Sequence, residues 1–256
     1  MSTTPKTYLI TGANRGIGKG FVEMLLQRPG TTVIATARDP AKAVTSLNEL
    51  PKATGSRLLI VKLDAQVDAD AARAVSQLRQ EHSVTSIDVV IANAGISHSG
   101  APVIQNSAEA LRDHFNINTI GPVTLFQAVY PLLKASLTRN PIFLPISTMI
   151  GSIGCQESLS ALPATFCPYG ASKAALNWIV SRIHYEEPWL TTWAAHPGLV
   201  LTDMVAILTS QGVDPTSIAA ISVETSVSGI LRQVDEGTRE KHGGKLRSHD
   251  GTTLPW

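Results

Sequence analysis

The sequence has few cysteines, almost no net charge and no long apolar run. Only Cys155 and Cys167 occur, and neither lies in a C-x-x-C pair or near histidine at metal-ligand spacing, so we expect neither a disulfide framework nor a metal site. The 21 basic and 20 acidic residues leave a formal net charge of +1, which disfavours binding to nucleic acid or an anionic membrane. No apolar stretch approaches the roughly 20 residues that span a bilayer.

Charge runs, low-complexity tracts and linkers are also missing. The chain of 256 residues is 43% hydrophobic and 16% charged, which is typical of a packed globular protein, and we predict one domain over residues 1–256. The start, MSTTPKTYLITG, has no charged leader before a long apolar region, so no signal peptide is expected. Together with the scarce cysteines, this favours a cytoplasmic location.

Short β-branched runs alternate with longer amphipathic segments. The alternation predicts an α/β Rossmann fold, with a doubly wound parallel sheet of about seven strands and helices on both faces. Ligands of such folds bind at the carboxyl ends of the strands. The predicted strands are Thr7 to Thr11, Thr32 to Ala37, Arg57 to Leu63, Ile87 to Ala92, Ile142 to Ile146 and Thr191 to His196, and the clearest helices are Gly18 to Leu26, Asp70 to Glu81 and Ser172 to Tyr185.

A glycine-rich turn follows the first predicted strand and opens a helix. Three glycines there allow a tight turn that brings backbone N–H groups and a helix N-terminus against an anion, which predicts a pyrophosphate site. The spacing differs from G-x-G-x-x-G, and the alternative is an ordinary strand-to-helix turn. The candidate residues of this turn are Gly12, Asn14, Arg15, Gly16, Ile17 and Gly18.

Arg38 follows the second predicted strand, where dinucleotide-binding folds discriminate between a ribose hydroxyl and a 2′-phosphate. A guanidinium suits bidentate contact with phosphate, and Arg15 could add a second cation, so we predict NADP(H) as the cofactor. The alternative is that Arg38 is a solvated surface charge and Asp39 binds the ribose.

The sequence resembles the short-chain dehydrogenase/reductase family over essentially its whole length. The ending from Gly243 to Trp256 resembles sniffer-type carbonyl reductases and fungal norsolorinic-acid-type ketoreductases. Seven ordered segments carry the family resemblance: TGANRGIG at 11–18, Asp64, Asn93-Ala94-Gly95, Asn118, Ser147-Thr148, Tyr169-Gly-Ala-Ser-Lys173 and Pro197-Gly-Leu-Val-Leu-Thr202.

The resemblance implies a reductase in which Tyr169 donates a proton to the alkoxide that hydride transfer creates. Lys173, four residues along the same helix, is expected to favour the phenolate and so lower the pKa of Tyr169. A hydroxyl binds the substrate oxygen: the alignment favours Thr148, with Ser147 as the alternative. Asn118 is implied to anchor a water chain to the lysine.

The resemblance also implies further cofactor contacts. Asp64 is expected at the adenine, and Asn93, Ala94 and Gly95 where the cofactor approaches the backbone. Val200 and Thr202, after the Pro197-Gly198 turn, are expected to bracket the nicotinamide carboxamide.

The segments near 151–168 and 203–221 are expected to cover the substrate, and their neutral, apolar sequence predicts an apolar carbonyl compound, with aromatic and polyketide-like ketones as candidates. The family often forms homodimers or homotetramers through helices near 107–135 and 168–185, and either assembly is possible here. The alternative function is an NADP(H)-binding protein that acts as a sensor or as a non-redox catalyst, for example of a cyclisation in secondary metabolism.

Overall fold

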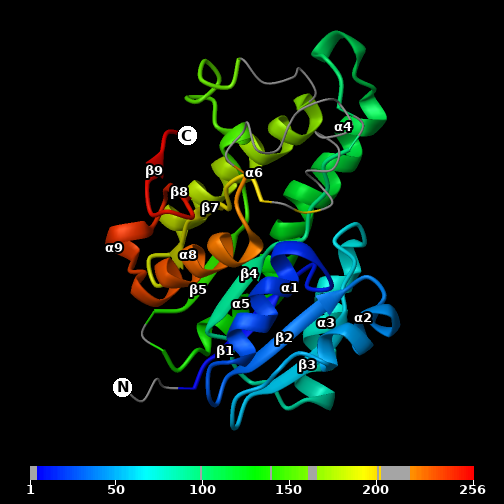
Figure 1. Ribbon diagram of the computed structural model, residues 1–256, viewed down its shortest axis with the longest axis vertical. Helices are drawn as coiled ribbons and strands as arrows, with labels where there is room; N and C mark the ends of the chain where they lie inside the picture. Colours follow the sequence, from blue (N-terminus) through cyan, green and yellow to red (C-terminus); the bar gives the residue numbers. More distant parts are fainter. Residues whose placement is uncertain (1–4, 99, 139, 161–165, 201, 203–219) are drawn as a thin grey trace.

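A computed structural model describes residues 5–98, 100–138, 140–160, 166–200, 202 and 220–256. Strands and helices alternate along most of this chain (Figure 1). The strands are β1 (Thr7–Ile10), β2 (Thr32–Ala37), β3 (Arg57–Lys62), β4 (Val89–Ala92), β5 (Ile142–Pro145), β6 (Thr191–Thr192), β7 (Ala194–His196), β8 (Leu246–Ser248) and β9 (Thr253–Leu254). The helices are α1 (Gly16–Leu26), α2 (Pro40–Asn48), α3 (Asp68–Glu81), α4 (Ala108–Phe115), α5 (Gly121–Lys134), α6 (Cys167–Glu186), α8 (Val223–Glu236) and α9 (Arg239–His242), with 3₁₀ turns at Val103–Gln105 and Met149–Gly151 and a π-helical turn at Asn116–Ile120.

The central sheet is parallel and runs in the order β3-β2-β1-β4-β5-β6. The described residues give it six strands, slightly fewer than the seven predicted. The segment predicted as one strand, Thr191 to His196, is divided at the fully buried Trp193: β6 pairs with β5, whereas β7 pairs with β8 in a second sheet of order β7-β8-β9. One bridge between Ile146 and Ala195 still joins the two sheets.

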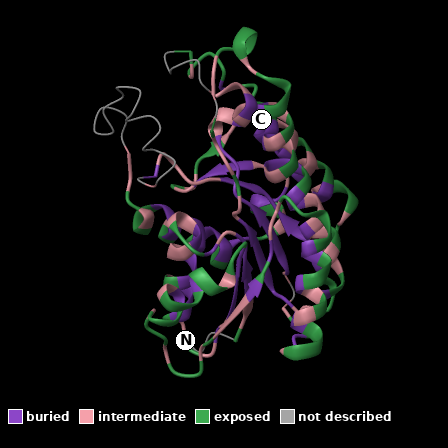
Figure 2. Ribbon diagram, turned by 90° about the vertical axis from the view of Figure 1, so that its right-hand side faces the viewer, coloured by how far each residue is buried: buried purple, intermediate pink, exposed green. Residues whose placement is uncertain are grey.

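Helices cover both faces of the sheet and form a three-layer arrangement (Figure 2). Side chains alternate along the strands, so that Tyr8 and Ile10 of β1 pack on one face and Leu9 on the other. The first face carries buried residues of α1, α2 and α8, and the second carries those of α3, α5 and α6. This confirms the predicted doubly wound fold.

The strand order reverses at β1, because β2 and β3 lie on one side of it and β4 and β5 on the other. The crevice beyond the carboxyl ends of β1 and β4 is the place where such sheets bind ligands. Among the described residues, no helix is both long enough and apolar enough to cross a membrane.

Candidate active site

The glycine turn leaves β1 at this crevice and has a backbone shape that requires glycine. Gly12 and Gly16 have φ values of +63° and +52°, which L side chains rarely adopt. A Cβ on Gly18 would lie 2.2 Å from the Gly12 carbonyl oxygen. The turn is held to β2 by the Ala13 N–H, which donates to the Thr36 carbonyl at 3.0 Å.

Helix α1 begins inside this turn without a side-chain cap. Its N-cap residue is Arg15, whose guanidinium has no acceptor for a backbone N–H, and the first turn contains no acidic residue. The first N–H groups of a helix need a partner, and an anion is a suitable one. Asn14 is exposed and Ile17 packs against the core, so the turn fits a pyrophosphate through its backbone.

Arg38 and Asp39 are both exposed at the end of β2 but differ in their contacts. Asp39 is the N-cap of α2, where it accepts from the Lys42 N–H and lies 3.3 Å from the Lys42 ammonium. Its carboxylate therefore already has the Lys42 N–H and ammonium as partners, which weakens the alternative that Asp39 binds a ribose. Arg38 remains the group at this strand end that suits a phosphate.

Asn93 fastens the exit of β4 to the glycine turn. Its side-chain amide donates to the carbonyls of Thr11 at 2.9 Å and Gly12 at 3.3 Å, and the Ala94 N–H donates to the Thr11 hydroxyl. Asn93 thus helps to fix the backbone of the glycine turn. Gly95 lies close to the catalytic helix: a Cβ there would lie 3.0 Å from Asn118 Oδ1 and 3.6 Å from Lys173 Nζ.

Asp64 follows β3 and folds back on its own turn, where its carboxylate accepts from the Gln66 N–H at 3.0 Å. The Asp64 N–H donates to the buried carboxylate of Asp70 at 3.1 Å. Asp70 also pairs with Lys62 and Arg73; the backbone hydrogen bond and these cations hold the pKa of Asp70 below its usual value despite its burial. Asp70 therefore fixes the turn that presents Asp64.

The segment after β7 returns to the glycine turn. The Pro197 carbonyl accepts a hydrogen bond from the Ser226 hydroxyl, and Gly198 has a φ of +82°, with His249 3.1 Å from where a Cβ would lie. Val200 is buried and bridges to Ile221. The methyl group of Thr202 would lie 3.3 Å from a Cβ placed on Gly16, so this segment reaches the glycine turn.

Tyr169 and Lys173 lie in the first turns of α6, with the lysine 4% exposed. The ammonium nitrogen lies 5.9 Å from the centre of the Tyr169 ring and donates to the Ile146 carbonyl at 2.7 Å. Burial lowers the pKa of Lys173 to about 8. Burial also raises the pKa of Tyr169 to about 12, opposite to the direction expected from Lys173, and a hydrogen bond with Thr148 only partly offsets it.

The hydroxyl pair after β5 divides into two environments. Thr148, 5% exposed, makes the side-chain hydrogen bond with Tyr169 and accepts from the Ile150 N–H at 3.2 Å. Ser147, 1% exposed, donates instead to Oδ1 of Asn177 at 2.5 Å. The geometry therefore favours Thr148 for contact with a substrate oxygen.

Asn118 lies in the π-helical turn between α4 and α5 and is fully buried. Such turns interrupt a helix and often occur at functional sites. Its amide oxygen accepts from the Ile96 N–H at 2.8 Å, and its amide nitrogen donates to the Ile96 carbonyl and to the Ser172 hydroxyl. Asn118 therefore links the exit of β4 to α6 beside Lys173.

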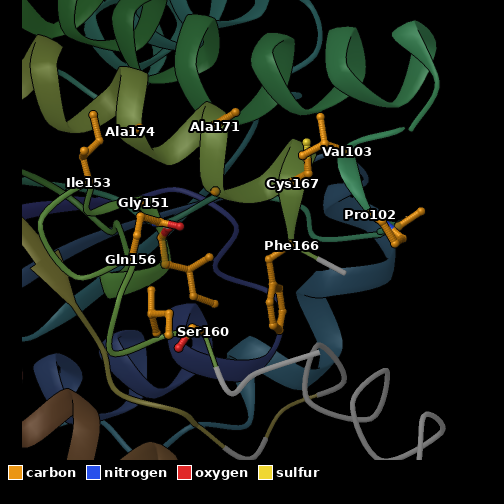
Figure 3. Close-up of a pocket in the computed structure, with 14 residues that line it drawn as sticks. Pro102, Val103, Gly151, Ile153, Gln156, Ser160, Phe166, Cys167, Ala171 and Ala174 are labelled. Carbon is orange, nitrogen blue, oxygen red and sulfur yellow. The ribbon is translucent and has the colours of Figure 1, made fainter. Parts of the chain in front are cut away.

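A cavity of about 440 Å³ lies beside the hydroxyl pair. Figure 3 shows Phe166 and Cys167 on one side of it and Gly151, Ile153 and Gln156 on the other. Neither Tyr169 nor Thr148 lines it, but their near neighbours Gly170 and Ile150 do. None of its lining residues is charged: Ala101, Pro102, Val103, Ile150, Gly151, Ile153, Gln156, Leu159, Ser160, Phe166, Cys167, Gly170, Ala171 and Ala174.

Residues 6–212 match the model of the short chain dehydrogenase family. The chain belongs to this family. It is 40% identical to the norsolorinic acid ketoreductase nor1 of Dothistroma septosporum, over 98% of this chain and 92% of the relative. This agrees with the expected oxidoreductase class, which interconverts carbonyl and alcohol groups.

Two solved structures of similar chains are carbonyl reductases. The NADPH-bound carbonyl reductase from chicken fatty liver is 29% identical, with a TM-score of 0.84 and coverage of 99% of this chain and 100% of that one. The carbonyl reductase Sniffer of D. melanogaster is 25% identical, with a TM-score of 0.81 and the same coverage. These similarities confirm the predicted branch of the family.

Three residues of the site were not predicted from the sequence: Asp70 and Asn177, which are buried, and His196, which is partly buried. His196 accepts from the Met149 N–H through Nδ1 at 3.3 Å, and burial lowers its pKa to about 4, so the ring is neutral at neutral pH. Asn177 carried one available signal, because it lies four residues after Lys173 and thus on the same helix face. The predicted covering segment at 203–221 lies outside the described residues, except for its last two positions.

Proposed function

We propose that the protein is an NADP(H)-dependent ketoreductase that interconverts a ketone and a secondary alcohol on an apolar substrate. The observation that carries the proposal is the hydrogen bond between Tyr169 and Thr148, together with the buried Lys173, whose ammonium nitrogen lies 5.9 Å from the centre of the Tyr169 ring. Two hydroxyl groups at one point can bind and protonate a single carbonyl oxygen.

The residues of the glycine turn fit a dinucleotide. The uncapped start of α1 would hold the pyrophosphate, and Arg38, with Arg15 close by in the turn, would hold a 2′-phosphate. Asp64 would meet the adenine, and Val200 and Thr202 the nicotinamide end. NADPH, when bound, supplies the hydride.

Tyr169 supplies the proton in the proposed reaction. A phenol whose pKa is raised to about 12 stays protonated at neutral pH and can donate to an oxygen that gains charge. Thr148 would hold that oxygen by a hydrogen bond. Lys173 would hold the nicotinamide ribose and stabilise the phenolate that remains after proton transfer.

The cavity beside these groups supports the proposed substrate class. Its volume of about 440 Å³ and uncharged lining suit a compact apolar ring system rather than a phosphorylated sugar or an acyl-carrier arm. The norsolorinic acid ketoreductase among the relatives supports norsolorinic acid as one test substrate.

Purified protein should therefore oxidise NADPH in the presence of norsolorinic acid or 1-tetralone, with one secondary alcohol formed for each NADPH consumed. Product identification by mass spectrometry provides the check. Tight NADPH binding without alcohol formation across a panel of apolar ketones would contradict the proposal and favour a sensor or a non-redox catalyst.

A further inference from the structure

The buried side chain of Asn177 joins the loop that carries Thr148 to the catalytic helix. Asn177 lies on α6 and is 3% exposed. Its Oδ1 accepts from the Ser147 hydroxyl at 2.5 Å, and its Nδ2 donates to the Gly151 carbonyl at 3.2 Å. The two contacts lie at the two ends of the segment 147–151, with Thr148 between them.

We infer that Ser147 and Asn177 form a positioning pair that fixes Thr148 against Tyr169. The inference rests on the proposed function, because it assigns the pair a role in holding those two hydroxyls. Asn177 lies one turn after Lys173 and two turns after Tyr169, so the helix that presents the proton donor also sets the place of its partner.

The same loop also has hydrogen bonds to β7 and packs closely on α6. On its opposite side the loop is bound to β7, since the Ser147 N–H donates to the Ala195 carbonyl and the Met149 N–H donates to His196. A Cβ on Gly151 would lie 2.7 Å from the Lys173 side chain, so the loop and helix are already at closest approach. Without Asn177, the loop keeps its hydrogen bonds to β7 but loses the two bonds that the Asn177 side chain makes at its ends.

Buried hydrogen bonds of this kind also make the two residues interdependent. Removing Ser147 leaves Oδ1 of Asn177 without its donor, and removing Asn177 leaves both the Ser147 hydroxyl and the Gly151 carbonyl short of a partner. The pair should therefore act as a unit in which the second loss adds little to the first.

A matched pair of variants tests the inference. Ser147→Thr and Ser147→Val have the same shape and differ only in the hydroxyl. We expect Ser147→Thr to keep kcat within about threefold of the wild type, and Ser147→Val and Asn177→Leu to lower kcat by about tenfold or more, because small displacements of reacting groups are costly. KM for 1-tetralone and the NADPH dissociation constant should change less than about twofold, since neither residue lines the cavity or belongs to the glycine turn.

The double variant Ser147→Val/Asn177→Leu should be no slower than the slower single variant. Ser136→Ala, which removes a hydrogen bond to Asp88 at the other end of the sheet, is the control for a loss of stability without a change in kcat. Thermal unfolding of every variant shows whether it is folded. If Asn177→Leu is not folded, the comparison of Ser147→Thr with Ser147→Val decides the inference.

Equal kcat for Ser147→Thr and Ser147→Val would overturn the inference. So would full activity of Asn177→Leu with a slow Ser147→Val, because Ser147 would then act directly on the substrate. A wild-type protein that reduces no ketone, by contrast, contradicts the proposed function itself, and the two failures are therefore distinguishable.

Discussion

The glycine turn after β1 and the hydroxyl loop after β5 lie at the same edge of the sheet, but they hold their functional groups by different means. The turn depends on backbone shape, with positive φ at Gly12 and Gly16, and the cations Arg15 in the turn and Arg38 at the end of β2 are exposed. The hydroxyl loop depends on buried side chains, with Ser147 and Asn177 almost fully enclosed.

The difference indicates a division of labour. Exposed cations and backbone N–H groups can bind an anion with little reorganisation, which suits a cofactor that enters and leaves. Buried hydrogen bonds resist displacement, which suits groups that must meet a reacting atom in one geometry. Variants in the turn should therefore change binding, and variants near the loop should change turnover.

The largest effect is expected for Tyr169→Phe. The substitution removes the proton donor and keeps the ring, so the turnover number for 1-tetralone should fall by about 10³-fold. NADPH affinity, measured by nicotinamide fluorescence, should change little. Retained turnover would mean that another group supplies the proton.

Lys173→Met should separate turnover from stability. It should lower turnover by about 100-fold while raising the free energy of unfolding at pH 7 by about 1–3 kcal/mol, because the buried ammonium is replaced by an apolar group of similar length. Urea unfolding without cofactor measures the second effect.

The gain in the free energy of unfolding from Lys173→Met should depend on pH. The folded-state pKa of Lys173, about 8, lies below the ordinary value of 10.5, so the unfolded chain holds the proton more tightly between these values. The free energy of unfolding of the wild type should therefore rise from pH 8 to 10.5 relative to that of Lys173→Met. The difference in this free energy between the two proteins should narrow. A gap that stays constant would show that Lys173 does not titrate in this range.

Arg38→Ala tests the binding side of the comparison. Loss of charged hydrogen bonds to a 2′-phosphate should weaken NADPH binding by about 10- to 100-fold and NADH binding hardly at all. Lys42→Ala removes a nearby exposed cation and is the matched control. Equal effects of Arg38→Ala on both cofactors would contradict its assignment to the phosphate.

The smallest effect is expected in the cavity. Ala171→Phe adds a ring to its wall and should raise KM for 1-tetralone by a few-fold, about 1 kcal/mol, but leave KM for cyclohexanone unchanged. Ala135→Phe, on an exposed residue at the end of α5, is the control. The same rise in KM for both ketones would place the substrate outside this cavity.

The same contrast explains what the sequence could predict. Glycines, an exposed arginine and a Tyr-x-x-x-Lys spacing are local signals, and the alternation of strands and helices predicted the three layers. Asn177, His196 and Asp70 act through contacts that folding alone creates, such as the bond between Ser147 and a residue 30 positions later. The split at Trp193 has a similar cause, because β8 joins from a distant part of the chain.

Single-turnover kinetics of Arg38→Ala at saturating NADPH test the division of labour most directly. If the glycine turn and Arg38 only bind the cofactor, the rate of 1-tetralone reduction should match the wild type within about twofold once the variant is saturated. A rate as low as that of Tyr169→Phe would contradict the account, because the cofactor side would then take part in the chemistry itself.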